Sequence, residues 1–244
     1  MSHGSAIHLH PTAPLAERVL LPGDPGRALA LAQALLERPL MFNHHRGLWG
    51  YTGEAPDGLP LTIQATGMGG PSAAIVLAEL AQLGARRAIR VGTCGALAPQ
   101  LALGELVIAA EAICADGASR ALGGGERAQA DGELTDALAR RLPDAPRGAV
   151  VSTDLFYETG VAGGDDGHRA GTGAGGGRDG ALAIEMEAAT LFAVGARNRL
   201  RVACLLAVTD VFDARGARTR IDDHALLGAA ERMGRAAIAA LSER

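Results

Sequence analysis

The sequence contains no lysine, few aromatic residues and only three cysteines, Cys94, Cys114 and Cys204. Its 23 basic residues are all arginine, and 27 acidic residues bring the net charge to −4, which argues against a general nucleic-acid or acidic-membrane surface. No apolar run approaches the roughly 18–20 residues that span a bilayer, and the N-terminus lacks the features of a signal peptide. The odd set of cysteines has no metal-ligand spacing and favours a reducing compartment. These absences predict a cytoplasmic protein that acts on a small molecule.

Short apolar runs that end in glycine alternate with alanine-rich helical patterns along the 244 residues. This alternation predicts one α/β domain over residues 1–244, with much of its sheet parallel. The expected strands are residues 18–22, 61–65, 88–91, 106–109, 148–151 and 202–208. The expected helices are residues 26–36, 72–83, 135–142, 188–197 and 221–241. Thr219 and Asp222 form a pair like a capping box at the start of the last helix.

Residues 160–180 do not fit this pattern, because they contain ten glycines and show no hydrophobic period. We expect a mobile loop here. Regular elements are expected on both sides, so the segment is either inserted into the fold or takes the place of a more ordered element.

Three arginines stand beside glycine at expected strand ends: Arg27, Arg46 and Arg90. Arginine forks donate paired hydrogen bonds to an oxyanion, and neighbouring glycines let backbone N–H groups approach it. The pattern therefore indicates a phosphate site. Surface ion pairs are the alternative for any one of these arginines taken alone.

Acidic and aromatic residues at other strand and helix ends suggest the rest of a ligand site. Glu185 and Glu187 precede an alanine-rich helix, where they are expected to point to different faces, and either could bind sugar hydroxyls or only favour the helix dipole. Asp210 ends an apolar strand and could be a general acid or a turn cap. Phe156 could stack on a planar base or fill the core. Together these residues describe a pocket for phosphate, a pentose and a planar leaving group.

With these residues in order, the sequence resembles the hexamer-type purine nucleoside phosphorylases of bacteria and archaea, within the larger nucleoside phosphorylase family. The resemblance runs from Ile7 to about Asp210. It is carried by seven motifs: LPGDPGR at 21–27, NHHRG at 43–47, TGMGGPS at 66–72, IRVGTCGA at 89–96, STDLFY at 152–157, EMEAA at 185–189 and VTD at 208–210.

The resemblance implies a distorted mixed sheet or barrel flanked by helices, and assembly as a homohexamer, a trimer of dimers with shared active sites. It implies reversible phosphorolysis of purine nucleosides or deoxynucleosides to the free base and the pentose 1-phosphate. Phosphate is then a co-substrate, and no cofactor, metal, nucleic acid or membrane takes part.

The resemblance also implies a role for each matching residue. The implied phosphate ligands are Gly23, Arg27, Arg90 and Thr93, with Arg46 from the neighbouring subunit. The implied ribose contacts are Met68, Met186 and Glu187, with His8 from the neighbour. The implied base contacts are Phe156, Thr209 and Asp210, where Asp210 protonates purine N7 as the glycosidic bond breaks.

Four other activities compete with this interpretation. Uridine phosphorylases share the Arg27 and Arg90 motifs, but they lack the late acid and read uracil with a Gln and an Arg that follow the Phe-Tyr motif. Related nucleosidases attack with water and need no phosphate arginines. Archaeal 5′-methylthioadenosine phosphorylases look much like this sequence at its start and in the Gly-Gly-Pro-Ser motif at 69–72, and His8 argues against them only mildly. A relative that binds nucleosides without catalysis is the last alternative.

Some bacterial relatives carry an arginine on the final helix that assists the acid. The corresponding place here holds Asp223 or His224. Arg215, Arg218 and Arg220 lie close in sequence, but the spacing assigns the role to none of them.

Overall fold

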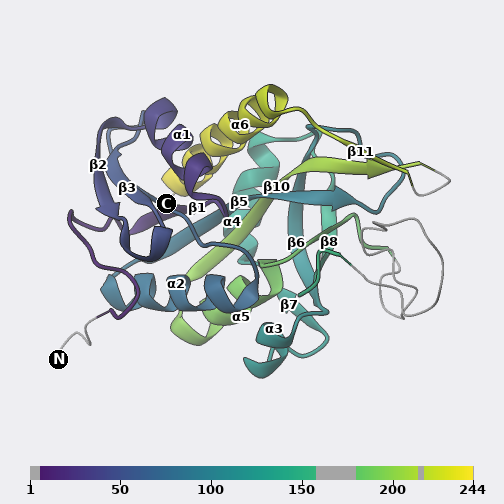
Figure 1. Ribbon diagram of the computed structural model, residues 1–244, viewed down its shortest axis with the longest axis horizontal. Coiled ribbons are helices and arrows are strands. Elements are labelled where there is room, and N and C mark those ends of the chain that lie inside the picture. Colours follow the sequence, from purple (N-terminus) through teal and green to yellow (C-terminus); the bar gives the residue numbers. More distant parts are fainter. Residues whose placement is uncertain (1–5, 158–179, 214–216, 244) are drawn as a thin grey trace.

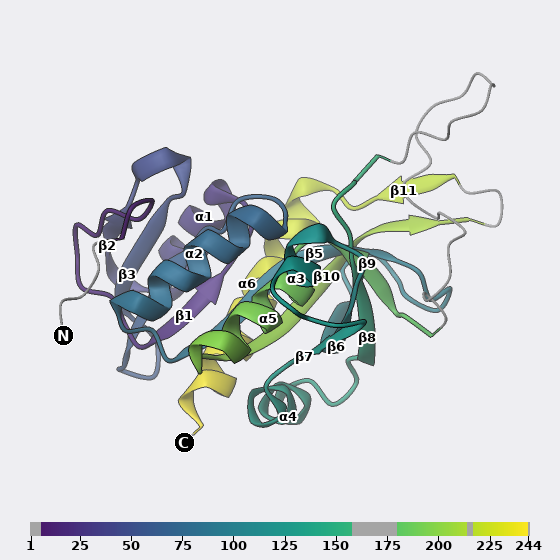
Figure 2. The same ribbon diagram turned by 90° about the horizontal axis from the view of Figure 1, so that it is seen from below.

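The computed structural model describes residues 6–157, 180–213 and 217–243. Within them, eleven strands form one mixed sheet that helices cover on both sides (Figures 1 and 2). The strands are β1 (Arg18–Leu21), β2 (Glu37–Asn43), β3 (Gly50–Glu54), β4 (Pro60–Gln64), β5 (Arg87–Ala96), β6 (Leu106–Cys114), β7 (Arg127–Gln129), β8 (Arg147–Ser152), β9 (Ala183–Glu185), β10 (Arg201–Phe212) and β11 (Arg218–Arg220). The helices are α1 (Pro25–Leu35), α2 (Gly70–Leu83), α3 (Gly117–Ala121), α4 (Gly132–Arg141), α5 (Ala188–Asn198) and α6 (Asp223–Ser242), with a 3-10 turn, η1, at His45–Gly47.

The sheet closes on itself in its middle. Its strand order is β11-β10-β6-β8-β9-β5-β1-β4-β3-β2, and β10 also pairs with β5. Strands β5, β10, β6, β8 and β9 therefore form a closed ring, while β1 to β4 extend from it as an open wing. Strands β1, β4, β5 and β10 run parallel, and β9 returns antiparallel on β5. The predicted distorted mixed sheet is thus confirmed.

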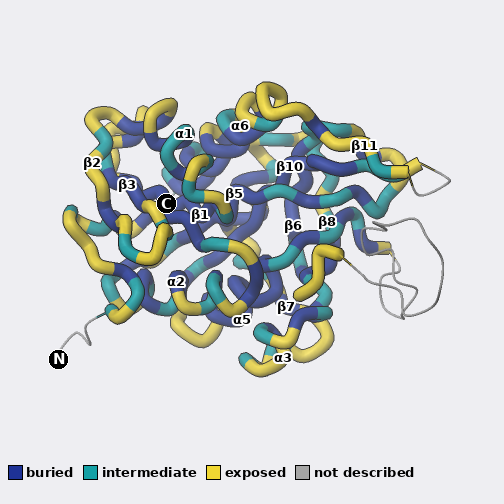
Figure 3. Tube along the Cα trace, viewed as in Figure 1, coloured by how far each residue is buried: buried dark blue, intermediate teal, exposed yellow. Residues whose placement is uncertain are grey.

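Two hydrophobic cores lie on opposite faces of this sheet. Alternate residues of β10 enter different cores: Cys204, Leu206 and Val208 pack with α2 and α5, whereas the residues between them pack with α1, α4 and α6. This is the period of two that a strand buried on both faces requires. Figure 3 shows the result, with buried strands at the centre and exposed backbone in the peripheral loops.

The six strands and five helices expected from the sequence are all present, and several extend beyond the expected limits. The start of the last helix differs from the one expected from the sequence. Asp222 is its N-cap, and its side chain accepts a hydrogen bond from the Ala225 N–H. Thr219 lies instead in β11, paired with Val211, so the predicted capping pair is wrong.

The glycine-rich stretch at 160–180 lies almost wholly outside the described residues, so its expected mobility stays a prediction. None of the described helices is both long and apolar enough to cross a membrane.

Candidate functional site

A cavity of about 360 Å³ opens where the ends of β1, β4, β5 and β10 meet the start of α5. The parallel strands bring these ends together, as expected for α/β sheets. Ten of the twelve predicted site residues line the cavity: Gly23, Arg27, Met68, Arg90, Thr93, Phe156, Met186, Glu187, Thr209 and Asp210.

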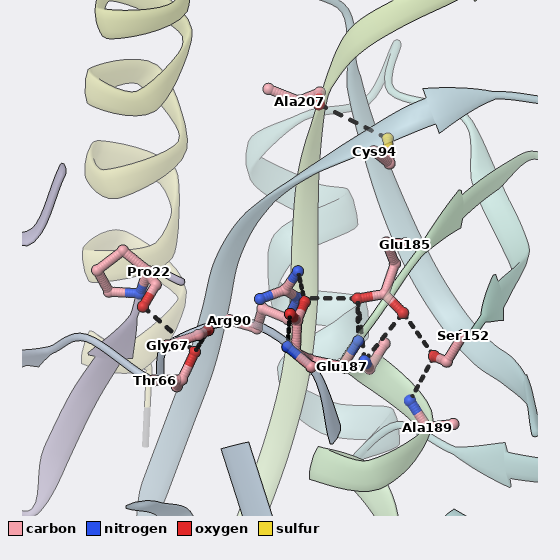
Figure 4. Close-up of polar contacts among 12 residues, drawn as sticks. Pro22, Thr66, Gly67, Arg90, Cys94, Ser152, Glu185, Glu187, Ala189 and Ala207 are labelled. Carbon is pink, nitrogen blue, oxygen red and sulfur yellow. Dashed lines mark hydrogen bonds and ion pairs between the residues drawn. The ribbon is translucent and has the colours of Figure 1, made fainter. Parts of the chain in front are cut away.

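Arg90 lines the cavity and contacts two carboxylates, those of Glu185 and Glu187 (Figure 4). It is only 3% exposed, and its Nη2 forms an ion pair with Glu187. Its Nε lies 3.1 Å from Glu185 Oε2, but off the direction of the N–H, so this contact is an ion pair rather than a directed hydrogen bond. Burial opposes the charge of Arg90, yet Glu187 and Glu185 raise its pKa above the ordinary value. Arg90 is therefore a fixed cation.

Glu185 and Glu187 converge on Arg90, and the expectation that they point to different faces is wrong. The strand ends at Glu185, and Glu187 already occupies the N-cap position of α5, so the alternation of a strand does not continue between them. Glu185 accepts hydrogen bonds from the N–H groups of Glu187 and Ala188, and from Ser152 Oγ. Glu185 thereby fixes the first turn of α5 against β8.

The end of the cavity beside Gly23 is suited to an anion. Arg90 Nη1 is buried and makes no hydrogen bond to the described residues, and it would lie 3.9 Å from a Cβ placed on Gly23. Arg27, on the first turn of α1, is half-buried nearby. Burial lowers its pKa; Asp24 opposes this shift and the positive charge of Arg90 adds to it. Arg27 and Arg90 thus bring two cations and an unused N–H to this end of the cavity, a combination suited to an oxyanion.

Glycine also shapes the adjoining wall, where β4 passes into α2 and the Gly67 carbonyl oxygen lies 3.4 Å from a Cβ placed on Gly23. Gly67 and Gly69 have positive φ values of 75° and 86°, which glycine adopts without strain. The Gly69 N–H donates to Glu187 Oε1 at 2.6 Å, so this loop and Arg90 together fix the Glu187 carboxylate. Met68 between the two glycines is 87% exposed at the cavity rim.

Asp210 reaches the far end of the cavity through a β-bulge. The register between β10 and β5 shifts between Val208 and Asp210, and a bulge of this kind turns a side chain out of its regular direction. Thr209 Oγ1 lies 2.7 Å from Asp210 Oδ2, and Arg218 Nε donates to Asp210 Oδ1 at 2.6 Å. Arg220 lies 3.5 Å from the same oxygen. Spacing in the sequence does not single out Arg218, because only the hairpin of β10 and β11 brings it back to Asp210.

Phe156 lies beside this acidic end and is 41% exposed. The Arg218 Cζ is 5.0 Å from the centroid of its ring, and Tyr157 packs edge-on with a centroid distance of 4.9 Å. Phe156 therefore belongs to the cavity wall rather than to the core.

His8 and Arg46 do not line the cavity. The His8 ring lies 2.7 Å from Glu79 Oε1, and Arg46 is exposed in η1. Their surroundings are linked, because His45 Nδ1 is 3.0 Å from the His8 carbonyl. The two residues predicted to serve a neighbouring subunit thus lie near one another, outside their own site.

The described residues contain no group of three or more His, Cys, Asp or Glu side chains that could hold a metal ion.

Known proteins resemble this chain in sequence and in structure. A family model described as the phosphorylase superfamily matches residues 17–242. A DeoD-type purine nucleoside phosphorylase from Clostridium beijerinckii is 35% identical over 215 residues, covering 85% of this chain and 86% of that protein. A guanosine phosphorylase from Halorubrum lacusprofundi is 34% identical and covers 79% and 77%. The crystal structure of uridine phosphorylase from Vibrio fischeri has a TM-score of 0.74 at 26% identity, over 93% and 90% of the two chains. The family resemblance predicted from the seven motifs is confirmed.

Proposed function

The chain belongs to the phosphorylase superfamily, and on that premise we propose that it cleaves purine nucleosides with inorganic phosphate. A phosphate oxygen attacks C1′ of the pentose, the C1′–N9 bond breaks, and its electron pair leaves with the purine. The products are the free base and the pentose 1-phosphate. The observation that carries the proposal is one cavity that brings together a buried, unused Arg90 N–H and the acid Asp210.

Phosphate binds between Arg90 and the N-terminus of α1. Arg27 and Arg90 supply charge, Thr93 supplies a hydroxyl, and the Gly23 backbone supplies an N–H. Arg90 is already balanced by Glu185 and Glu187, so a phosphate dianion calls for a further cation. Arg46 of a neighbouring subunit meets that requirement.

The pentose lies above the phosphate, where Glu187 accepts hydrogen bonds from its 2′- and 3′-hydroxyls. Gly69 and Arg90 fix this carboxylate before substrate arrives, which lowers the cost of ordering it. Met68 and Met186 pack against the sugar, and His8 of the neighbour meets the 5′-hydroxyl.

The base stacks on Phe156 with its N7 edge toward Thr209 and Asp210. Breaking the glycosidic bond places positive charge on the sugar and negative charge on the purine. Phosphate stabilises the first charge, and a proton from Asp210 to N7 neutralises the second. Both interactions strengthen in the transition state, which is the condition for catalysis.

The working unit is an oligomer, proposed as a homohexamer built from dimers. His8 and Arg46 lie outside their own cavity, and Ile7 and Trp49 expose 72% and 38% of their surface beside them. Exposed apolar side chains of this kind are suited to an interface. The three cysteines are buried and unpaired, which fits a reducing cytoplasm. We assign no cofactor or metal to the reaction.

Base release from inosine, with and without phosphate, tests the proposal. We expect release only with phosphate, and faster release than from uridine or 5′-methylthioadenosine. Release without phosphate would indicate a nucleosidase. Calorimetric binding of inosine without any turnover would indicate a binding protein. Faster release from uridine or 5′-methylthioadenosine would move the assignment to those phosphorylases.

Asp210→Asn tests the role of the acid. We expect kcat for inosine to fall by about 10²–10⁴, the usual contribution of general acid catalysis, in a protein that remains folded. Asp136→Asn is the matched control, because Asp136 is an exposed carboxylate on α4 that pairs with Arg147. An Asp210→Asn enzyme with the kcat of the parent would refute the assignment.

A further inference from the structure

Arg218 is the cation at the base end of the cavity. It begins β11, which pairs with β10 so that Arg218 faces Phe212 and Arg220 faces Asp210. Its Nε donates to Asp210 Oδ1, and its Cζ lies over the Phe156 ring. Arg218 therefore touches two of the three residues that the proposed function gives to the purine, Asp210 and Phe156.

Both oxygens of Asp210 are already engaged at this end. Oδ1 accepts from Arg218, and Oδ2 lies in hydrogen-bond contact with Thr209. The two Nη groups of Arg218 make no hydrogen bond to any other described residue, and they leave N–H donors for a ligand.

The edge of a purine that carries N7 also carries the 6-substituent. A 6-oxopurine presents two acceptors there, whereas a 6-aminopurine presents one acceptor and one donor. Arginine N–H groups can donate to both acceptors of a 6-oxopurine. Against a 6-aminopurine, an arginine N–H would face the N–H groups of the amino substituent, and two donors cannot form a hydrogen bond. Moreover, negative charge that develops on the leaving base spreads to O6 of a 6-oxopurine, where the guanidinium stabilises it in the transition state.

We infer that Arg218 determines specificity and selects 6-oxopurine nucleosides over 6-aminopurine nucleosides. This inference rests on the proposed function. A well-placed arginine contact to a base edge discriminates by roughly 1–3 kcal/mol, which corresponds to about 5- to 150-fold in kcat/KM. Inosine and guanosine are then the preferred class, and adenosine is the poor one.

Steady-state kinetics of Arg218→Met with inosine and adenosine test the inference. We expect the parent enzyme to favour inosine within the range above, and Arg218→Met to bring the ratio of the two kcat/KM values close to one. If Arg218 only holds Asp210 in place, both substrates lose activity equally and the ratio stays unchanged, which would overturn the inference. A parent enzyme that favours adenosine would overturn it as well.

Arg220→Met is the matched control. Arg220 also approaches Asp210, but its side chain is 58% exposed and does not line the cavity, so the inosine-to-adenosine ratio should not move. Calorimetric titration with hypoxanthine and with adenine gives a readout that needs no turnover. Tighter binding of hypoxanthine, lost in Arg218→Met, supports the inference even if phosphorolysis is not observed. Equal binding of hypoxanthine and adenine overturns the inference. Phosphorolysis that proceeds equally well with inosine and adenosine refutes the inference but leaves the proposed function standing.

Discussion

At the scale of single residues, the site depends on one guanidinium that must stay where it is. Arg90 is nearly inaccessible and lies between two carboxylates, so it keeps its place without a ligand. The side chain runs along β5 over Gly92. A Cβ added to Gly92 would lie 2.6 Å from Arg90 Cζ and 2.7 Å from Nη2. The glycine is thus required by the arginine two residues before it.

Gly92→Ala should therefore impair phosphate binding. Arg90 has little room to move, so we expect overpacking to cost about 1–3 kcal/mol in the free energy of unfolding and KM for phosphate to rise about tenfold or more. Urea denaturation and initial rates at varied phosphate measure the two effects. Gly95→Ala is the control on the same strand, because its Cβ would meet only ordinary contacts at 3.4 Å or more. An unchanged phosphate KM in Gly92→Ala would contradict this account of Arg90.

Residue types at strand and helix ends pointed to Arg27, Arg90, Phe156, Glu187 and Asp210, and the family resemblance implied the other five predicted residues that line the cavity. Neither predicted the contacts between them. Glu185 and Glu187 both form ion pairs with Arg90, and this depends on where β9 ends and α5 begins. The pairing of Arg218 with Asp210 depends on a hairpin whose second strand has only three residues. Such contacts follow from tertiary geometry, which neither spacing nor periodicity encodes.

At the scale of elements, a buried arginine connects three parts of the chain far from the cavity. Arg18 on β1 is 4% exposed and donates from Nη1 and Nη2 to Asp57 in the turn between β3 and β4, at 2.5 and 3.0 Å. Ser242 at the end of α6 donates to the same carboxylate. The clasp of Arg18, Asp57 and Ser242 therefore holds the last helix against the open wing of the sheet.

The clasp should weaken in acid. The hydrogen bonds from Arg18 are the largest cause that lowers the pKa of Asp57 from 3.8 to about 2. Because the folded pKa is the lower one, the stabilisation is complete above pH 3.8 and is lost as the pH falls toward 2. Asp57 is partly exposed, so we expect the pH-dependent part to be no more than about 1 kcal/mol. The difference in unfolding free energy between the parent and Asp57→Asn, measured in urea from pH 6 down to pH 2.5, should shrink with falling pH. A difference that stays constant or grows would contradict the assignment.

The same scale shows which elements a sequence can predict. The long strands and helices have a clear hydrophobic period and were expected. Strands β2 and β3 were not, because β2 has mostly exposed side chains and β3 contains two glycines in five residues. Strand β9 has three residues, and pairing with β5 and β8 defines it. These strands are stabilised by neighbours distant in sequence, and their own residues carry little signal.

At the scale of the whole molecule, His8 and Arg46, the two residues predicted to complete a neighbouring subunit's site, lie in segments that contact one another. Glu79 Oε1 accepts the N–H of Ile7 and contacts the His8 ring, and Glu79 Oε2 accepts the N–H of Leu9. The rings of His10 and His45 stack with centroids 3.8 Å apart. These contacts fix the N-terminal segment against the turn that carries Arg46. Residues that complete the active site of a partner subunit must be held in a fixed position, and these contacts hold His8 and Arg46 in that way.

Two inactive variants should restore activity to one another if the site is shared. Arg46→Ala removes a residue proposed to serve the partner, and Asp210→Asn removes one that serves its own cavity. In a mixed dimer one site keeps both groups and the other loses both. Random pairing makes about half of the dimers mixed, so co-expression in equal amounts should return about a quarter of the parent rate of inosine phosphorolysis. Arg27→Ala with Asp210→Asn is the control, because both residues serve their own cavity and no intact site can form. Recovery in both mixtures, or in neither, would show that Arg46 does not cross to the partner's site.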